Sequence, residues 1–400
     1  MRIYHFSEEP YPDVWSPDRP TLRVTLPNEL CVPQRANELY HRYIDEWMLA
    51  DELGFDIMLN EHHSTATCLT ASANLLLAIL ARVTKRARLL VLGVPVCNRQ
   101  DPVRIAEEMA MVDVISGGRL EFGMIKGVPY EIAPANSQPT RMMDRFWEAH
   151  DLIVKAMTTH NGAFNFEGEF FHHRTVNIWP RPWQQPHPPI WSSTSTPSNA
   201  KEIGLRGYVV GSFMGGIEET IKLHKAYAEG YRQAGFGNDV PVDRFGYLAM
   251  CATAEDEGEA RRRADLIADY LRTNAQVADP FNKPPGYFSV DAAFRSMRSP
   301  NPAAFRTLYT PKGRPVELAT ASLDDFIECG IAFAGTPEQV YNQICAFVDG
   351  IGGLGNLLLM GQGGHMNHAE TVDSLTLMGK HVLPKLKARY PEDMKFARAA

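Results

Sequence analysis

The sequence predicts a (β/α)8 TIM barrel, a closed ring of eight parallel strands surrounded by helices. Three observations support this prediction. Short apolar runs typical of buried strands alternate with longer segments whose apolar residues recur at helical spacing. There are eight such strand candidates, and the composition does not change abruptly along the 400 residues. Barrels of this class commonly use a chain of this length as one domain, so we expect a single domain over residues 1–400.

The predicted strands are short and apolar. In chain order they span residues 3–6, 55–59, 88–93, 119–124, 189–193, 208–212, 245–252 and 356–360. The alternating stretch "FNFEGEFFHHRTVNI" lies between the fourth and fifth strands and is expected to form a separate β-hairpin.

Predicted helices separate the strands. They span residues 37–53, 70–83, 102–115, 141–159, 198–205, 217–234, 254–272 and 368–386. The segment from about 274 to 321 is rich in Pro, Phe and Met and only weakly periodic, so it does not fit a minimal barrel unit. We interpret it as an insertion after strand seven that forms a lid over the barrel mouth.

Residues 350–355 have the G-x-G-x-x-G spacing of a dinucleotide-binding fingerprint. That motif requires a strand before the glycines and a helix after them. Here a capping box, Thr336 to Gln339, starts a helix that runs into the glycines, and an apolar strand follows. The order favours a helix-to-strand turn and disfavours a nicotinamide enzyme.

Composition limits the classes of partner. A net charge of -7 with no basic stripe argues against nucleic acid and anionic membrane surfaces, which leaves small molecules. The N-terminal stretch does not look like a signal peptide and no apolar run approaches about 18 residues, so we expect a cytoplasmic protein. The six cysteines form no C-x-x-C pair, and we expect reduced thiols without disulfides or a zinc site.

Polar residues directly follow the second predicted strand. The stretch "LNEHHS" places Asn60, Glu61, His62 and His63 at a strand end, where barrels build their active sites. Imidazole changes its charge near neutral pH, which indicates a proton donor or acceptor. A metal site would need a third protein ligand, and none is predicted. We expect four other histidines to be surface or capping residues: His172, His173, His365 and His368.

Two other strand ends carry groups that suit a phosphate. Lys126 lies between Gly123 and Gly127 after strand four, although a solvated lysine would give the same pattern. After strand five, residues 192–196 are all Ser or Thr and precede Pro197 at an expected helix start. Hydroxyls and free N–H groups at a helix start form an anion site, and an uncharged turn is the alternative. Because the two strands are adjacent, both groups can hold one phosphate.

These features together resemble the bacterial luciferase-like flavin-dependent monooxygenase superfamily. The resemblance covers nearly the whole chain in consistent order. It lies in "LNEHHS", in "DPVRIAEEMAMVDVISGGRLEFGMIKG", in the Ser/Thr loop ahead of a helix ending "GLRG", and in "GTPEQV" before the last strand. The central block is fairly specific, whereas "GTPEQV" and the glycines are weaker.

The resemblance implies a (β/α)8 barrel that binds FMN, usually as reduced FMNH2 supplied by a separate flavin reductase. The reduced flavin reacts with O2, and a flavin C4a-hydroperoxide then oxygenates a substrate, here expected to be small and largely apolar. By position, His62 is similar to the family's catalytic histidine, and Glu61 is assigned with it to the cofactor site.

The other implied cofactor residues come from three strand ends. Gly93 and Val94 correspond to a peptide that the luciferases hold as a non-prolyl cis bond beneath the flavin ring. Lys126 takes the place of a phosphate-binding arginine. The loop that meets the phosphate supplies Ser193, Ser195 and Thr196.

The chain departs from the family pattern at three places. Lys126 offers a point charge instead of a bidentate guanidinium. Ile125 stands where light-emitting members carry a reactive cysteine, so luminescence is not implied. Ser195 replaces an acidic residue of the phosphate loop, which leaves the role of that position open.

Two alternatives remain beside the FMNH2-dependent monooxygenase. One is an F420-dependent hydride-transfer oxidoreductase of the same superfamily, which would not consume O2. The other is a flavin-binding barrel without turnover, against which His62 argues.

The sequence also offers candidates for a substrate wall and for a subunit interface. Trp191, Phe213 and Met214 either shield the site from water or belong to the barrel core. The apolar helix "TASANLLLAIL" and the helix after Asp101 resemble those through which family members pair, so a homodimer is expected.

Overall fold

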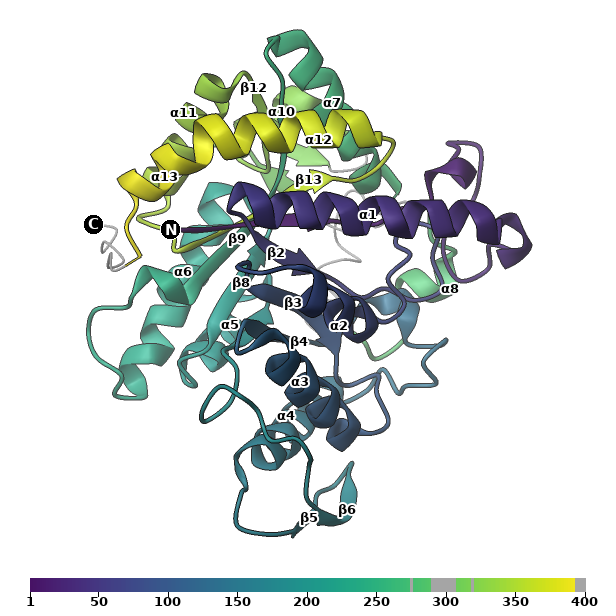
Figure 1. Ribbon diagram of the computed structural model, residues 1–400, viewed down its shortest axis with the longest axis vertical. Helices are drawn as coiled ribbons and strands as arrows, with labels where there is room; N and C mark the ends of the chain where they lie inside the picture. Colours follow the sequence, from purple (N-terminus) through teal and green to yellow (C-terminus); the bar gives the residue numbers. More distant parts are fainter. Residues whose placement is uncertain (274–275, 289–306, 318–319, 393–400) are drawn as a thin grey trace.

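The computed structural model describes residues 1–273, 276–288, 307–317 and 320–392, and it contains the predicted closed barrel of eight parallel strands (Figure 1). Around the ring the strands are β1 (Arg2–Ser7), β2 (Asp56–Leu59), β3 (Leu89–Pro95), β4 (Leu120–Ile125), β7 (Ile190–Ser193), β8 (Val209–Phe213), β9 (Phe245–Thr253) and β13 (Asn356–Gln362). Parallel pairing of β13 with β1, from Arg2 opposite Asn356 onward, closes the ring.

Helices surround the barrel in the predicted order. They are α1 (Pro33–Leu53), α2 (Ala73–Val83), α3 (Pro102–Ser116), α4 (Met142–Thr158), α5 (Pro197–Gly204), α6 (Gly216–Gln233), α7 (Glu257–Arg272) and α11 (Pro337–Gly350). The ends of α1 show why helix ends can be predicted from the sequence. Pro33 begins the helix, and Gly54 ends it in the left-handed conformation, with φ of 88°.

The last predicted helix is interrupted. It consists of α12 (His368–Leu377), a π-helical turn (Met378–Val382) and α13 (Leu383–Arg389). Pro384 explains the interruption, because its nitrogen carries no hydrogen for the bond to the carbonyl four residues earlier.

Two short elements escape prediction from sequence. Strand β12 (Ala332–Gly335) pairs with the second half of β9, beside the ring. Helix α10 (Leu323–Glu328) precedes it. A four-residue strand of Ala, Phe and Gly and a six-residue helix are too short to show a period, so no pattern announces them.

Two local predictions are confirmed. Antiparallel strands β5 (Phe164–Glu167) and β6 (His172–Val176) form the hairpin, which projects from the barrel at the lower end of the view in Figure 1. The glycines at 350–355 lie between helix α11 and strand β13, with Gly352 and Gly353 at positive φ. This is a helix-to-strand turn, not a dinucleotide site.

The expected insertion follows α7. Its described parts are the short helix α8 (Asp279–Asn282) and an antiparallel pair, β10 (Thr307–Tyr309) with β11 (Pro315–Glu317). Parts of the predicted lid segment 274–321, namely residues 274–275, 289–306 and 318–319, lie outside the described residues, so the lid stays a prediction.

A buried carboxylate organises the interior at the amino ends of the strands. Glu121 on β4 accepts hydrogen bonds from the Tyr4 hydroxyl at 2.9 Å and from the Trp191 indole at 2.8 Å. Its other oxygen pairs with the guanidinium of Arg2 at 3.0 Å and with that of Arg88. Trp191, for which both a substrate wall and a core position were open, is therefore a core residue.

Replacing Glu121 with Ala is expected to lower the free energy of unfolding by about 3 kcal/mol or more, because removing one partner of a buried charged network leaves the others uncompensated. Urea denaturation followed by circular dichroism measures the change. A loss below about 0.5 kcal/mol, the size of an ordinary surface substitution, would contradict the assigned role.

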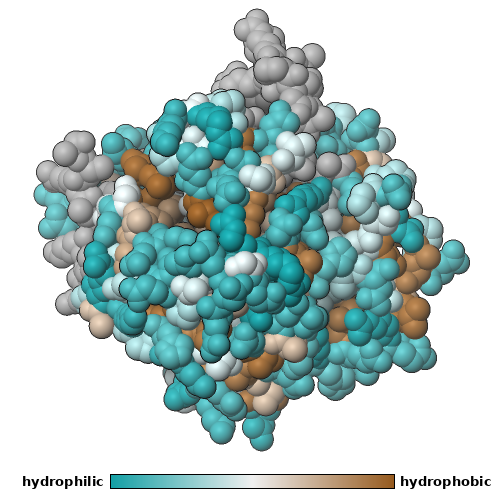
Figure 2. Space-filling model, turned by 90° about the horizontal axis from the view of Figure 1, so that it is seen from above, coloured by the Kyte–Doolittle hydropathy of each residue, from teal (hydrophilic) through white to brown (hydrophobic). Residues whose placement is uncertain are grey.

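The face on the α7–α12 side, seen from above in Figure 2, is mostly hydrophilic with separate apolar patches. Within the described ranges, no helix is long and apolar enough to cross a membrane.

Candidate active site

The carboxyl ends of the barrel strands form a mouth with two unlike sides. One side is polar. It contains three buried residues, each two positions beyond a core residue of β1, β2 or β13: Glu8, Asn60 and Gln362. Since side chains two positions apart in a strand lie on the same face, we infer that these three also lie on the inner face of the barrel. The opposite side is apolar and contains core residues of β3, β4, β8 and β9, namely Leu92, Ile125, Phe213 and Met250. The mouth thus combines apolar walls with a few buried polar groups, as ligand sites commonly do.

His62 lies on the polar side, in the loop after β2, with 14% of its side chain exposed. Its Nδ1 atom is 2.9 Å from Oε1 of Glu131, a fully buried residue in the turn after β4. The same oxygen accepts the backbone N–H of His63 at 3.1 Å. Glu131 therefore fixes the ring of His62 and leaves Nε2 available for a ligand in the mouth.

The surroundings of His62 act on its pKa in opposite directions. Burial alone lowers the pKa, but the hydrogen bond and the charge of Glu131, together with the charge of Glu8, raise it above the usual value. Burial in turn raises the pKa of Glu8, against the charge of His62 and hydrogen bonds from Asn60 and Tyr270. The titrations of His62 and Glu8 are linked, because the charge of each residue acts on the pKa of the other.

Glu61 is buried behind the histidines. Its Oε1 pairs with the guanidinium of Arg99 at 2.6 Å and with Nε2 of His63 at 3.0 Å, and its Oε2 accepts the N–H of Ala73 at 3.1 Å. Since its oxygens bind protein groups, Glu61 shapes the loop after β2. Its contact with a cofactor stays a prediction.

The cis peptide lies one residue earlier than expected, between Leu92 and Gly93 instead of Gly93 and Val94. Leu92 and Gly93 form an irregularity in β3, where both lie opposite Gly123 of β4. A Cβ on Gly93 would lie 2.7 Å from the carbonyl oxygen of Gly123, so the backbones approach too closely for any side chain there.

Lys126 follows β4 and contacts the insertion. Its Nζ donates to the carbonyl of Tyr287 at 2.8 Å and lies 3.6 Å from the centre of that ring. The Tyr287 hydroxyl donates to the carbonyl of Gly127 at 2.6 Å, and burial lowers the pKa of Lys126. A lysine ammonium has three N–H donors, so Lys126 can bind a phosphate oxygen in addition to the Tyr287 carbonyl.

The Ser/Thr loop lies beside Lys126, because β4 and β7 are paired, with Met124 opposite Ser192. Ser193 is half-buried, whereas Ser195 and Thr196 are exposed. Thr196 is the N-cap of α5 but its side chain makes no capping hydrogen bond, so it leaves the first N–H groups of the helix to another acceptor.

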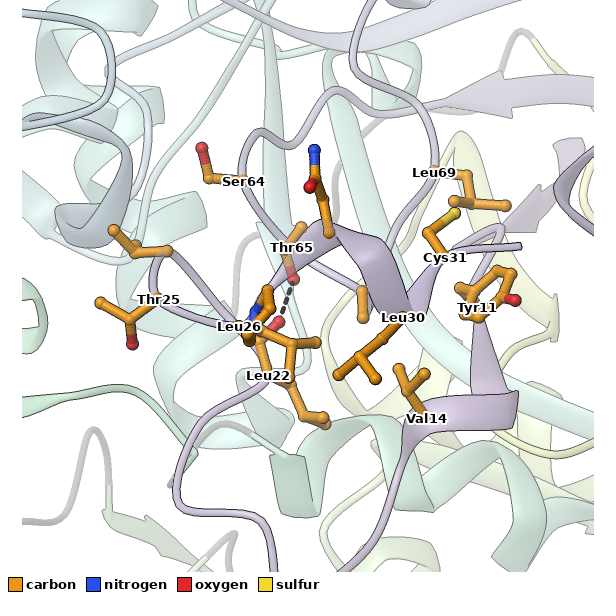
Figure 3. A pocket seen from close by; sticks show the side chains of 14 residues that line it. Tyr11, Val14, Leu22, Thr25, Leu26, Leu30, Cys31, Ser64, Thr65 and Leu69 are labelled. Carbon is orange, nitrogen blue, oxygen red and sulfur yellow. Dashed lines mark hydrogen bonds between the residues drawn. The ribbon is translucent and has the colours of Figure 1, made fainter. Parts of the chain in front are cut away.

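A cleft of about 550 Å³ lies outside the mouth, between the loops after β1 and β2 (Figure 3). The Thr65 hydroxyl donates to the carbonyl of Leu22 at 3.4 Å and joins the two loops. The residues that line this cleft include no Asp, Glu, Lys, Arg or His. In the part of the chain that the structure describes, no cluster of three or more His, Cys, Asp or Glu residues is arranged to hold a metal ion.

Several polar residues of the mouth were not singled out in the sequence. They are Glu8, Arg23, Tyr130, Glu131, Tyr270 and Gln362. Glu131 had a usable signal, since it follows the fourth strand at a position where barrels place functional side chains. Arg23 had none, because it lies in a long loop far from any strand end in the sequence.

Comparisons with known proteins identify the family of the chain. Residues 22–353 match the model of the luciferase-like monooxygenase family. The oxygenase component of a flavin-dependent trigonelline monooxygenase from Acinetobacter baylyi is 32% identical over 171 residues, or 42% of this chain. The chain spans about half the length of that relative (46%) and of an uncharacterized protein from Sinorhizobium fredii (57%), also 32% identical. An FMNH2-dependent dimethylsulfone monooxygenase from Pseudomonas putida is 24% identical over 85% of this chain and 86% of its own.

Solved structures share the fold. The monooxygenase RslO1 from Streptomyces bottropensis has a TM-score of 0.72 at 23% identity, covering 96% of this chain and 100% of its own. The oxygenating constituent of 3,6-diketocamphane monooxygenase from Pseudomonas putida, in complex with FMN, has 0.69 at 18% identity, with coverage of 96% and 98%. An F420-dependent secondary alcohol dehydrogenase has 0.64 at 15% identity, with coverage of 96% and 98%.

A family model that covers most of the chain, relatives named as flavin monooxygenases and a barrel with the expected strand ends lead to one assignment. The chain belongs to the luciferase-like monooxygenase family.

Proposed function

We propose that the protein is the oxygenase component of a two-component, FMNH2-dependent monooxygenase that acts on a small organic molecule with O2. The observation that carries the proposal is the pairing of His62 with Glu131 at a mouth whose neighbouring strand ends offer a cation and hydroxyls. A separate flavin reductase would supply the reduced cofactor, as the term oxygenase component implies for the trigonelline enzyme.

The residues present fit a flavin phosphate. Lys126 supplies a positive charge, and Ser193, Ser195 and Thr196 supply hydroxyls at the neighbouring strand end and at the start of α5. The close contact of Gly93 with Gly123 provides backbone free of side chains beside this edge, where Val94 is also buried. Reduced FMN, when bound, supplies the electrons that activate O2.

The chain's own residues orient, shield and handle protons. Glu131 holds Nδ1 of His62, so Nε2 is the atom at which a proton is given or taken. The apolar side of the mouth, with Leu92, Ile125 and Phe213, excludes water from the reacting groups. Glu61 keeps His63 and Arg99 in place behind them.

Replacing Glu131 with Gln is expected to lower the pKa of His62, because the charge that raises it is removed while burial remains. In the native protein this ion pair stabilises the fold below the unfolded pKa of about 6.5, and that contribution is lost as the pH rises through the raised folded pKa. A shift of the turnover pH profile to lower pH, with partial recovery in Glu131→Asp, measures the effect. An unchanged profile would remove Glu131 from this role.

Anaerobic titration distinguishes the proposed cofactor from F420. We expect reduced FMN to bind and F420 to bind more weakly, since Lys126 is the cation that the sequence places at the predicted phosphate edge, whereas the F420 tail is longer and acidic. Preferential binding of F420, with no O2 uptake, would instead identify a hydride-transfer enzyme. Binding of FMN without turnover would identify the non-catalytic barrel.

We also propose a homodimer formed through α2 and α3. These neighbouring helices expose large apolar side chains at a spacing of four residues, Leu75 with Ile79 and Met111 with Ile115, between 42% and 69% exposed. An apolar face of this kind is usually covered by a partner.

The double substitution Leu75→Glu and Met111→Glu is expected to convert the dimer to a monomer, because each places a charge in an apolar interface. Light scattering after gel filtration gives the mass. Trp179→Glu is the control, since Trp179 is 82% exposed on a different segment and should not affect the mass. A double variant that keeps a dimeric mass would refute this interface.

A further inference from the structure

Arg23 is a buried guanidinium in the loop after β1. Only 2% of the residue is exposed. Its side chain donates to the carbonyl of Thr273 at 2.6 Å and to the Thr273 hydroxyl at 3.2 Å. Both of these acceptors are neutral groups.

The contrast with Arg263 shows how unusual this is within the described chain. Arg263 is the other buried arginine, and it pairs with Asp373 at 2.7 Å and Glu259 at 2.9 Å. Arg23 has no ion pair within 4 Å among the described residues. Arginine is rarely fully buried unless it is paired, because removing its charge from water is costly.

The position of Arg23 places it in the mouth. Its guanidinium carbon lies 5.5 Å from the centre of the Tyr130 ring, which in turn lies 6.3 Å from the ring of His62. The charge of Arg23 also acts on the pKa values of His62 and Glu8. Arg23 is therefore part of the polar side of the mouth.

The backbone holds Arg23 in this direction. The N–H of Val24 donates to the carbonyl of Ser64 at 2.6 Å, and the N–H of Ala66 donates to the carbonyl of Leu22 at 3.0 Å. Leu22 and Val24 line the outer cleft shown in Figure 3, whereas the side chain of Arg23, between them, contacts Thr273. The two loops thus fix a single positive charge toward the mouth.

We propose that Arg23 binds a carboxylate of the organic substrate, so that the enzyme acts on an organic acid with an apolar body. Guanidinium groups bind carboxylates through two parallel hydrogen bonds, and a bound carboxylate would supply the ion-pair partner that Arg23 lacks within the described part of the chain. The apolar side of the mouth receives the rest of the molecule. This inference rests on the proposed function, because it names the substrate class of the same site.

Benzoate and benzamide test the proposal, since they have the same shape and differ in charge. Saturation-transfer NMR titrations of the full-length protein give both affinities without flavin. We expect the native protein to bind benzoate about 10-fold more tightly than benzamide. Arg23→Met should remove this preference and leave benzamide binding unchanged, and Arg23→Lys should restore part of it.

Arg19→Met is the matched control, because Arg19 lies in the same loop and is partly exposed, and it should keep the preference for benzoate. Equal affinities in the native protein, no binding of either probe, or a preference retained in Arg23→Met would overturn the proposal. A purely structural Arg23 would give a lower melting temperature in Arg23→Met with the preference intact. A variant that loses FMN affinity but keeps the preference would instead assign Arg23 to the flavin.

The two proposals fail separately. Benzoate binding requires no cofactor, so its absence would leave the monooxygenase proposal in place. If the protein loaded with reduced FMN fails to react with O2, the measured preference of the mouth for benzoate over benzamide still stands.

Discussion

Replacing His62 with Asn is expected to reduce the turnover number by about 10²- to 10⁴-fold, the usual contribution of a positioned acid or base. The amide nitrogen of Asn can still donate to Glu131, so the buried carboxylate keeps its partner. What is lost is Nε2, the ring nitrogen that Glu131 does not hold. Steady-state O2 consumption with reduced FMN measures the effect, and FMN affinity should change less than about threefold.

The control for this variant is His172→Asn. His172 lies on the β5–β6 hairpin, with 60% of its side chain exposed and Nδ1 3.3 Å from a carboxylate oxygen of Glu167. Its replacement should leave turnover unchanged. Unchanged turnover in His62→Asn would show that His62 transfers no proton in the reaction. It would also remove the argument that His62 makes against a flavin-binding barrel without turnover.

Replacing Lys126 with Met is expected to weaken FMN binding by about 10- to 100-fold, the worth of a charge-assisted hydrogen bond. The loss should be specific to the phosphate, because Lys126 follows β4 at the edge where the Ser/Thr loop begins. Fluorescence titration with FMN and with riboflavin, which lacks the phosphate, separates the two contributions. Riboflavin affinity should be unchanged.

Tyr287 contacts Lys126 at the same edge. Its carbonyl accepts a hydrogen bond from Nζ of Lys126, and the centre of its ring lies 3.6 Å from the same atom. Because the ammonium group has two further N–H donors, Lys126 can bind a phosphate oxygen while it keeps this contact. An equal loss of FMN and riboflavin affinity in Lys126→Met would show that the lysine supports the ring or the fold instead of the phosphate.

The barrel could be predicted because its signals are local. Strand β13 is a continuous apolar run, α1 ends at Gly54, and α11 begins with the capping box of Thr336 and Gln339. Each of these patterns depends on neighbouring residues alone. The position of His62 followed as well, because a histidine directly after an apolar strand must lie at the mouth once the fold is known.

The partners of His62 could not be predicted, since they come from distant segments. Glu131 reaches His62 only when β2 and β4 curve into one ring, and Arg23 reaches Tyr130 only when the long loop after β1 folds back over the strand ends. The predicted position of the cis peptide was wrong by one residue, because the irregularity in β3 depends on the pairing of β3 with β4. Such features are set by tertiary contacts that leave no periodic trace.

A rapid-mixing experiment tests the central proposal most directly. The protein is loaded with reduced FMN under anaerobic conditions and is then mixed with O2. Flavin absorbance is followed with and without the protein. We expect an O2-dependent absorbance species that outlasts the reaction of free reduced FMN and decays faster in His62→Asn or when substrate is present. Reoxidation indistinguishable from that of flavin alone would contradict the monooxygenase proposal.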